Sequence, residues 1–198
     1  MLNNKTMTAN IPVESHPWQP FLPEGAEILM LGSFPPKRER WSMDFFYPNI
    51  QNDMWRIMGL LFYDDKDYFI DTVQGKPRFG YDRVVAFCTA KHIALYDAAT
   101  AVRRLKDNAS DAFLEIVQPT DILAMLRQLS NCRKVVSTGG KSADAIAGQL
   151  GCVVPAVGSS TPFTLDGQPY RFYRMPSSSR AYPLKLEKKA EAYRRVFE

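Results

Sequence analysis

The feature that most constrains the fold is the segment Ala26–Leu31, which is apolar apart from Glu27 and is ended by Gly32. A segment this apolar offers no polar face to solvent, so it fits a strand buried on both faces. Such strands occur in sheets that helices cover on both sides. A second strand is predicted at residues 133–138, where Gly139 and Gly140 lead into a helix. The opening expectation is therefore a layered α/β protein.

Helical patterns alternate with these strands. Apolar residues recur at helical spacing, and candidate capping residues precede one of the segments. A mainly helical stretch, broken near residue 93, is predicted for residues 81–105. The remaining expected helices are 54–62, 122–129 (capped by Thr120 or Asp121), 142–150, and a last helix opened by Pro183. Alternation of strands and helices predicts one α/β domain with a mostly parallel sheet.

Length and composition fit a single globular domain. The chain has 198 residues, of which 45% are hydrophobic and 23% charged, which is ordinary usage for a folded protein. Residues 1–20 are polar and proline-rich and are expected to form an arm, followed by one domain over residues 21–198. No segment is apolar over the length of a membrane span, and the N-terminus does not resemble a signal peptide. A cytoplasmic protein without membrane contact is expected.

Cysteine and histidine are too sparse to predict a metal centre. Cys88, Cys132 and Cys152 are widely spaced, and only His16 and His92 could join them as ligands. Zinc and iron–sulfur sites need about four ligands, usually at short spacings. Buried, reduced thiols and no metal are therefore expected.

The charge permits a nucleic-acid partner without establishing one. The net charge is +4 and the pI is near 8.9, values that many proteins without nucleic-acid function share. The distribution is more informative, because the cations gather in three places. They are Lys37, Arg38 and Arg40 after the first strand, Arg171, Arg174 and Arg180 around a late turn, and Lys185, Lys188, Lys189, Arg194 and Arg195 on the last helix.

A glycine-rich turn after the second strand resembles the end of a phosphate-binding loop. Residues 138–142 read Thr-Gly-Gly-Lys-Ser, but the full pattern requires a further glycine where the chain has Val135. Without that glycine, the backbone amides cannot wrap a phosphate. We expect a tight turn into a helix here and no nucleoside-triphosphate site.

Two other loops contain unusual residues, and both follow predicted strands. The first covers residues 32–55 and the second residues 175–183. In open α/β sheets, ligands bind beyond the carboxyl ends of the strands. These loops are therefore the first candidates for a functional site.

The residues of these loops resemble the uracil-DNA glycosylase superfamily. The segments Met175–Ser179 and Tyr47–Trp55 are similar to segments of the thymine/uracil mismatch glycosylases, while Gly32–Pro35 and Ala94–Arg104 are similar to the hypoxanthine-DNA glycosylase branch. The similar motifs extend from about residue 26 to 197, in family order. The resemblance implies a three-layer αβα sandwich with a short, mostly parallel central sheet.

The resemblance also implies an activity. Enzymes of this family flip a damaged base out of DNA and hydrolyse its N-glycosidic bond with water, so no cofactor or metal is implied. Uracil or hypoxanthine in DNA is the expected substrate, and a monomer the expected state. By resemblance, Asn52 positions the water, and Asp53 is a candidate general base.

The residue types suit this chemistry as well. A flipped base needs aromatic rings to stack on and amides to read its edge, and a small Pro-Ser turn can approach phosphates closely. Arg180 at the tip of that turn could fill the gap in the duplex. The expected base pocket comprises Gly32, Ser33, Phe34, Tyr47 and Asn49. The expected DNA contacts are Pro176, Ser177, Ser178, Ser179, Arg180 and Lys185.

Several alternatives remain open. Phe34 stands where mismatch glycosylases have asparagine, and Tyr47 where the hypoxanthine branch has histidine, so the preferred base is undetermined. Asn49 and Asn52 also suit turns and helix caps, and Asp97 suits a structural role. A non-catalytic DNA-binding or damage-sensing protein is the main alternative, and a small-molecule enzyme is the third.

Overall fold

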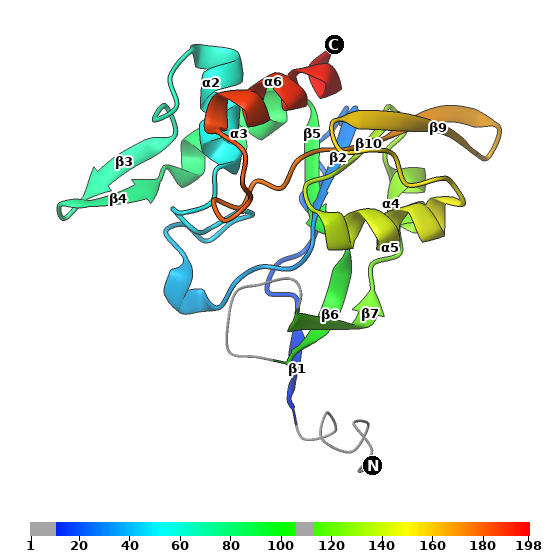
Figure 1. Ribbon diagram of the computed structural model, residues 1–198, viewed down its shortest axis with the longest axis horizontal. Coiled ribbons are helices and arrows are strands. Elements are labelled where there is room, and N and C mark those ends of the chain that lie inside the picture. The colour runs from blue at the N-terminus through cyan, green and yellow to red at the C-terminus, as the bar shows by residue number, and fades with distance from the viewer. Residues whose placement is uncertain (1–10, 106–112) are drawn as a thin grey trace.

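A computed structural model describes residues 11–105 and 113–198, the side chain of Lys141 excepted. Its centre is a five-stranded sheet in the order β5-β2-β8-β10-β9 (Figure 1). The strands are β2 (Ile28–Gly32), β5 (Ile93–Asp97), β8 (Lys134–Ser137), β9 (Ser159–Leu165) and β10 (Gln168–Arg174). Every residue of β2 and β5 is buried, as expected for strands covered on both faces.

The central sheet is mixed. Strand β2 pairs in parallel with β5 and β8, and β8 pairs in parallel with β10. Strand β9 runs antiparallel to β10 at one edge. This hairpin turns at Asp166 and Gly167, which both have positive φ, the conformation that Asp-Gly pairs favour in tight hairpin turns. The expectation of a mostly parallel sheet is therefore corrected to a mixed sheet with an antiparallel edge strand.

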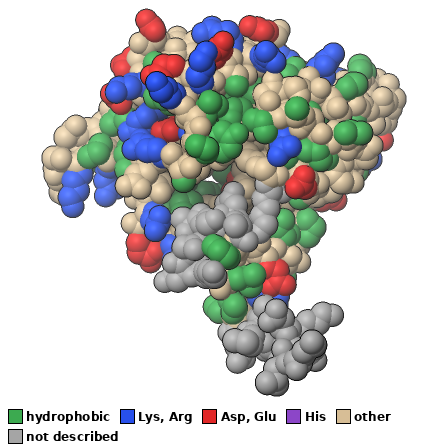
Figure 2. Space-filling view, in the orientation of Figure 1, with side chains coloured by type: hydrophobic (Ala, Val, Ile, Leu, Met, Phe, Trp, Pro, Cys, Tyr) green, Lys and Arg blue, Asp and Glu red, His purple; other side chains and the backbone are tan. Residues whose placement is uncertain are grey.

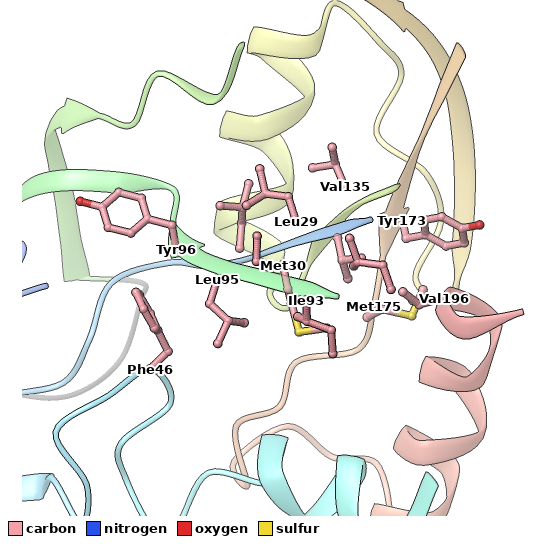
Figure 3. Close-up of a cluster of buried hydrophobic side chains, with 14 of the residues drawn as sticks. Leu29, Met30, Phe46, Ile93, Leu95, Tyr96, Val135, Tyr173, Met175 and Val196 are labelled. Carbon is pink, nitrogen blue, oxygen red and sulfur yellow. The ribbon is translucent and has the colours of Figure 1, made fainter. Parts of the chain in front are cut away.

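Helices cover both faces of this sheet (Figures 1 and 3). On one face lie α2 (Met54–Tyr63), α3 (Tyr81–Ala90) and α6 (Leu186–Phe197). On the other lie α4 (Ile122–Gln128) and α5 (Gly140–Leu150). The Asp121 side chain caps α4 by accepting from the Ala124 amide, so the predicted cap is confirmed.

Two smaller sheets were not predicted. Strands β1 (Val13–Ser15), β6 (Ala99–Arg104) and β7 (Leu114–Pro119) form an antiparallel sheet, and β3 (Ile70–Val73) and β4 (Lys76–Phe79) form a hairpin. The prediction of a mainly helical stretch over residues 81–105 is therefore wrong after α3.

The correction at β6 has a physical reason. Its apolar side chains do not join the main core; Ala99 and Val102 pack with Leu114 and the ring of Phe34 in a separate cluster. A strand pairing on both edges satisfies the backbone and buries these side chains together. Arg38–Arg40 form a short 3-10 helix.

The N-terminal arm is tied to the domain where the structure describes it. Residues 1–10 of the predicted arm lie outside the described residues. Beyond them, β1 pairs with β6, and Phe21 forms a two-way backbone bridge with Leu95. Residues 13–21 are thus part of the folded unit.

The main core lies on both sides of the central sheet (Figure 3). Trp55, Met58 and Tyr193 join α2 and α6 to one face, and Ile146 joins α5 to the other. The cysteines are free, and Cys88 and Cys132 are buried as predicted, whereas Cys152 is only partly buried. Burial raises the pKa of Cys132 to about 11, so its thiol stays protonated at neutral pH. Within residues 11–105 and 113–198, no helix is long and apolar enough to cross a membrane.

Candidate functional site

The two loops that the sequence singled out leave the same edge of the central sheet. Gly32 at the end of β2 lies in register with Asp97 at the end of β5, and Leu31 lies in register with Ser137 of β8. Arg174 at the end of β10 also pairs with Ser137. The loops after β2 and β10 therefore start side by side, where open α/β sheets bind ligands.

Gly32 is required by a close approach of Asp97. A Cβ atom added to Gly32 would collide with the Oδ1 of the Asp97 carboxylate. That carboxylate cannot move aside easily, because its Oδ2 accepts a hydrogen bond from Nε2 of His16 at 3.0 Å. The His16 and Asp97 side chains are only 2% and 9% exposed. A side chain larger than hydrogen at Gly32 would disturb this buried pair.

Substitution of Gly32 by alanine is accordingly expected to destabilise the protein by about 1–3 kcal/mol, the usual cost of overpacking a buried site. Chemical denaturation measures this cost. Gly148→Ala is the matched control, because nothing lies near its added Cβ and alanine favours a helix. An unchanged stability of Gly32→Ala would show that Asp97 can move.

Tyr47 closes the same edge from the loop after β2. It has a positive φ of 52°, an uncommon conformation for a large side chain. Its hydroxyl lies 3.0 Å from the Thr138 hydroxyl, which in turn contacts the Leu31 carbonyl. Burial, and then the Asp97 charge, raise the pKa of Tyr47 well above its ordinary value. Tyr47 thus presents a neutral, fixed ring beside Gly32 and Asp97.

The other candidate rings form one aromatic cluster around His16. Phe34 packs edge-on against the His16 imidazole, with ring centroids 5.4 Å apart, and Phe46 and Tyr96 also contact it. Phe46 is only 2% exposed, so it has little surface to offer a base. The sequence did not predict His16 here; its position depends on β1 pairing with β6.

The open space at this edge is small. A cavity of about 10 Å³ is lined by Ser33, Ala98, Val102, Leu114, Ile116 and Ser142. That volume holds about one water molecule. Figure 2 shows a wider hollow on this face, between the segment after β10 and the loop after β2, with Lys and Arg side chains to its left.

The two loops are joined directly through their backbones. Asn52 and Ser179 form an isolated antiparallel bridge. The Asp53 amide donates to the Ser178 carbonyl at 2.8 Å. The start of α2 and the segment Pro176–Ser179 therefore form one rim of the site. Asn52 and Ser178 in this rim are 126 positions apart in the sequence.

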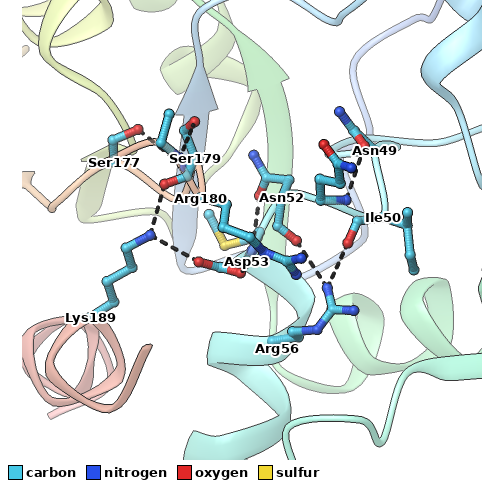
Figure 4. A network of polar contacts seen from close by, with 12 residues as sticks. Asn49, Ile50, Asn52, Asp53, Arg56, Ser177, Ser179, Arg180 and Lys189 are labelled. Atoms are coloured by element: carbon cyan, nitrogen blue, oxygen red, sulfur yellow. Dashed lines mark hydrogen bonds and ion pairs between the residues drawn. The ribbon is translucent and has the colours of Figure 1, made fainter. Parts of the chain in front are cut away.

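Asp53 pairs with two cations, Arg180 in the loop after β10 and Lys189 in α6 (Figure 4). Its Oδ1 accepts from Nε of Arg180 at 3.2 Å, and its Oδ2 accepts from Nζ of Lys189 at 2.9 Å. Lys189 also donates to the Ser179 carbonyl at 2.8 Å. Both carboxylate oxygens are therefore engaged by cations, an arrangement that favours a structural tie over the predicted general base.

Asn49 and Asn52 make the same local turn. The Asn49 Oδ1 accepts from the Gln51 amide, and the Asn52 Oδ1 accepts from the Met54 amide, both at 2.9 Å. The Asn52 oxygen therefore closes a turn before α2, as the turn alternative predicted, while Asp53 occupies the N-cap position. Within the described residues no partner is seen for the Asn52 Nδ2, and Figure 4 shows it pointing away from α2. The Asn52 side chain thus accepts a hydrogen bond within the turn through Oδ1 and still offers Nδ2 as a donor.

Arg56 stabilises this turn from α2. Its Nη1 donates to the Ile50 carbonyl at 2.7 Å. Burial, and then the Arg180 guanidinium, lower the pKa of Arg56 from its ordinary value. The rim therefore holds more positive charge than Asp53 alone neutralises.

The predicted DNA contacts differ in accessibility. Ser178 is 3% exposed and Pro176 is buried, its carbonyl accepting from the Tyr193 hydroxyl. Ser178 therefore cannot reach a phosphate with its side chain in this arrangement, which counts against its predicted contact. Exposed surface remains on Ser179, Arg180 and Lys185, and partial exposure on Ser177.

Among the described residues, no group of three or more His, Cys, Asp or Glu side chains could hold a metal ion. Asp97, His16 and Lys189 are the site residues that the sequence did not assign. As one of two adjacent lysines on a polar helix, Lys189 would be expected on a solvated face, but it is 1% exposed. Its spacing of four from Tyr193 and seven from Val196, both buried, is the signal that could have placed it on the inner face.

Comparison with known proteins supports the fold. No model of a known protein family matches the chain, and no curated protein matches it in sequence. Among solved structures, it is similar to the solution NMR structure of a protein from Methanosarcina acetivorans that carries the provisional name uracil DNA glycosylase. The two are 20% identical, the match covers 94% of this chain and 97% of that one, and the TM-score is 0.64. This similarity shows the fold and supports the α/β architecture that the sequence predicted.

Proposed function

We propose that the protein is a monofunctional DNA glycosylase of base excision repair, which hydrolyses the N-glycosidic bond of a flipped uracil or hypoxanthine. The observation that carries this proposal is the bridge between Asn52 and Ser179. It places a free amide donor, exposed hydroxyls and an exposed arginine on one rim, beside the ends of β2 and β5. The shared fold with the Methanosarcina protein adds support.

Asn52 is the residue that we assign to the nucleophilic water. Its Oδ1 is held by the Met54 amide, so the direction of Nδ2 is fixed before substrate arrives. A donor fixed in this way can hold a water oxygen without reorganising during the reaction. Bond cleavage leaves positive character on the sugar and negative charge on the base, and the cationic rim offsets the latter.

The remaining residues bind the nucleotide. Tyr47 and Phe34 supply aromatic surface, Gly32 and Ser33 line the end of β2, and Asn49 can read a base edge. Ser177 and Ser179 contact the backbone phosphates, with Lys185 contributing charge at the start of α6. Arg180 enters the duplex or contacts a phosphate. The small cavity at this edge must widen when a base enters.

Asp53 has a different role in this proposal from the one the sequence suggested. Its carboxylate is 9% exposed and is engaged by Lys189 and Arg180. Both of its oxygens already accept hydrogen bonds from these cations. We therefore propose that Asp53 orients the rim, while water adds to the anomeric carbon as the glycosidic bond breaks and its proton passes to the departing base or to solvent. The enzyme is expected to act as a monomer in the cytoplasm, with DNA as its partner.

Release of a free base tests this function. The purified protein is incubated with oligonucleotides containing uracil or hypoxanthine, and the released base is identified by chromatography. The proposal requires release of at least one of them. Failure with both bases, in single- and double-stranded DNA, would contradict the enzymatic claim.

A non-catalytic DNA-binding or damage-sensing protein is the second candidate. Phe34 favours it, because this ring stands where the mismatch glycosylases have a water-positioning asparagine. This candidate predicts DNA binding that survives Asn52→Ala, without base release. Absence of DNA binding at low salt would count against both candidates.

Arg180 provides a test of the DNA partner. If its guanidinium contacts a phosphate, Arg180→Met should reduce the slope of log K against log salt by about 1. Arg127→Met is the matched control: Arg127 is 53% exposed and pairs with Asp166, much as the 51% exposed Arg180 pairs with Asp53. Equal slopes for Arg180→Met and wild type would exclude this contact.

A further inference from the structure

The carboxylate of Asp53 has two cationic partners of very different exposure. The Arg180 side chain is 51% exposed, whereas the Lys189 side chain is 1% exposed. A buried ammonium without a partner is costly, so Lys189 is committed to its contacts. An exposed guanidinium loses little when it exchanges a carboxylate for water or another anion. The two cations are therefore not equivalent.

Lys189 joins two loops that are distant in sequence. Its Nζ donates to Asp53 Oδ2 at the start of α2 and to the Ser179 carbonyl in the loop after β10. Figure 4 shows the ammonium between these two acceptors. Both acceptors lie next to the Asn52–Ser179 bridge. Lys189 thus fixes the residue that follows Asn52 and the residue that precedes Arg180.

Arg180 is surplus to this arrangement. Lys189 alone neutralises the buried carboxylate. Arg56 is paired with Asp67, and burial and then the Arg180 guanidinium lower the pKa of Arg56. Repulsion between these two guanidinium groups weakens the hold of Asp53 on Arg180. An anion arriving at the exposed guanidinium would relieve this repulsion.

We infer that Lys189 is a positioning residue: it holds the Asn52 and Ser177–Arg180 loops together through Asp53 and leaves Arg180 free to exchange Asp53 for a DNA phosphate. This inference rests on the proposed function for the identity of the anion. It makes a specific prediction, because a buried lysine that cannot touch DNA should control a phosphate contact. Without Lys189, Asp53 depends on Arg180 alone and retains it.

The test compares Lys189→Met with Lys188→Met, its exposed neighbour paired with Glu191. Amide hydrogen exchange of residues 49–53 and 177–180 is measured by mass spectrometry, and DNA affinity is measured over a range of salt. Lys189→Met should accelerate exchange in both loops by about tenfold or more, whereas Lys188→Met should leave it unchanged. If amide exchange in both loops of Lys189→Met were as slow as in the wild-type protein, the inference would be overturned.

The salt dependence gives the second readout. Lys189→Met should reduce the slope of log K against log salt by about 1, and adding Arg180→Met should reduce it no further, since both remove the same contact. Adding Asp53→Asn to Lys189→Met should release Arg180 and restore the wild-type slope. The exchange of partners would be contradicted if Lys189→Met/Arg180→Met reduced the slope of log K against log salt by about 2. It would also be contradicted if adding Asp53→Asn to Lys189→Met did not restore the wild-type slope.

The double variant Asp53→Asn/Lys189→Met also covers the case in which Lys189→Met does not fold. It leaves no buried charge unpaired. We expect fast amide hydrogen exchange in its two loops, together with the wild-type slope of log K against log salt. Slow exchange in its two loops would overturn the inference. Neither readout requires base release, so a protein without glycosylase activity would refute the proposed function and still report on Lys189.

Discussion

Asn52→Ser is expected to lower the rate of base release by roughly 10²- to 10³-fold, the usual cost of removing one preorganised hydrogen-bond donor. Serine can replace the Asn52 Oδ1 that accepts from the Met54 amide, because serine makes the same kind of turn. It cannot replace the amide donor. The rate is measured with enzyme in excess over a lesion-containing oligonucleotide, so that product release does not contribute.

Two controls separate chemistry from folding in this experiment. Asn131→Ser removes an exposed amide elsewhere and should leave the rate unchanged. Thermal unfolding should place Asn52→Ser close to wild type, and Asn52→Ala somewhat lower because it loses the turn as well. An Asn52→Ser enzyme that retains the wild-type rate would show that Asn52 serves only the turn.

The second large effect is on stability. Asp53→Ala should lower the free energy of unfolding by about 3–5 kcal/mol, because it leaves the Lys189 ammonium buried without its anion. Asp53 provides no side-chain cap for α2, so loss of a cap does not complicate the measurement. Urea denaturation gives the free energy and, through its slope, checks that the unfolded state is unchanged.

Glu191→Ala is the matched control for this effect. Glu191 forms an ion pair with Lys188 in which both side chains are more than half exposed. Exposed pairs contribute little, so a change too small to resolve is expected. If Asp53→Ala were no more destabilising than Glu191→Ala, Lys189 would have another source of compensation, and the Asp53 link between α2 and α6 would be unimportant.

Strands β2 and β8 of the central sheet and most of its helices were predictable from local patterns, whereas β5 lies in the stretch predicted to be mainly helical. The apolar run at β2 and the Asp-Gly turn between β9 and β10 each have one favourable local structure, and α2 follows from helical spacing. Neighbouring residues determine these features. The second sheet was different, because β6 becomes a strand only by pairing with β1 and β7, from separate parts of the chain.

The location of the candidate site was predictable from local patterns, but the contacts within it were not. Its two loops could be located because both follow strands of one sheet. The contacts within the site could not be predicted, because they join residues far apart in the sequence. His16 and Asp97 are 81 positions apart, and Lys189 and Asp53 are 136 positions apart. A Lys-Lys pair on a polar helix is usually solvated. The inner position of Lys189 depends on how α6 packs against α2, which local sequence does not determine.

The most direct test of the proposed glycosylase is the pattern of alkali-sensitive breaks in a matched set of duplexes. The duplexes carry uracil, hypoxanthine or a G·T mismatch at one position, with an undamaged duplex as control, and alkali cleaves any abasic site formed. The account predicts breaks at uracil or hypoxanthine with the wild-type protein and their loss with Asn52→Ser. Binding to these duplexes without breaks in any of them would contradict it and favour the damage-sensing protein.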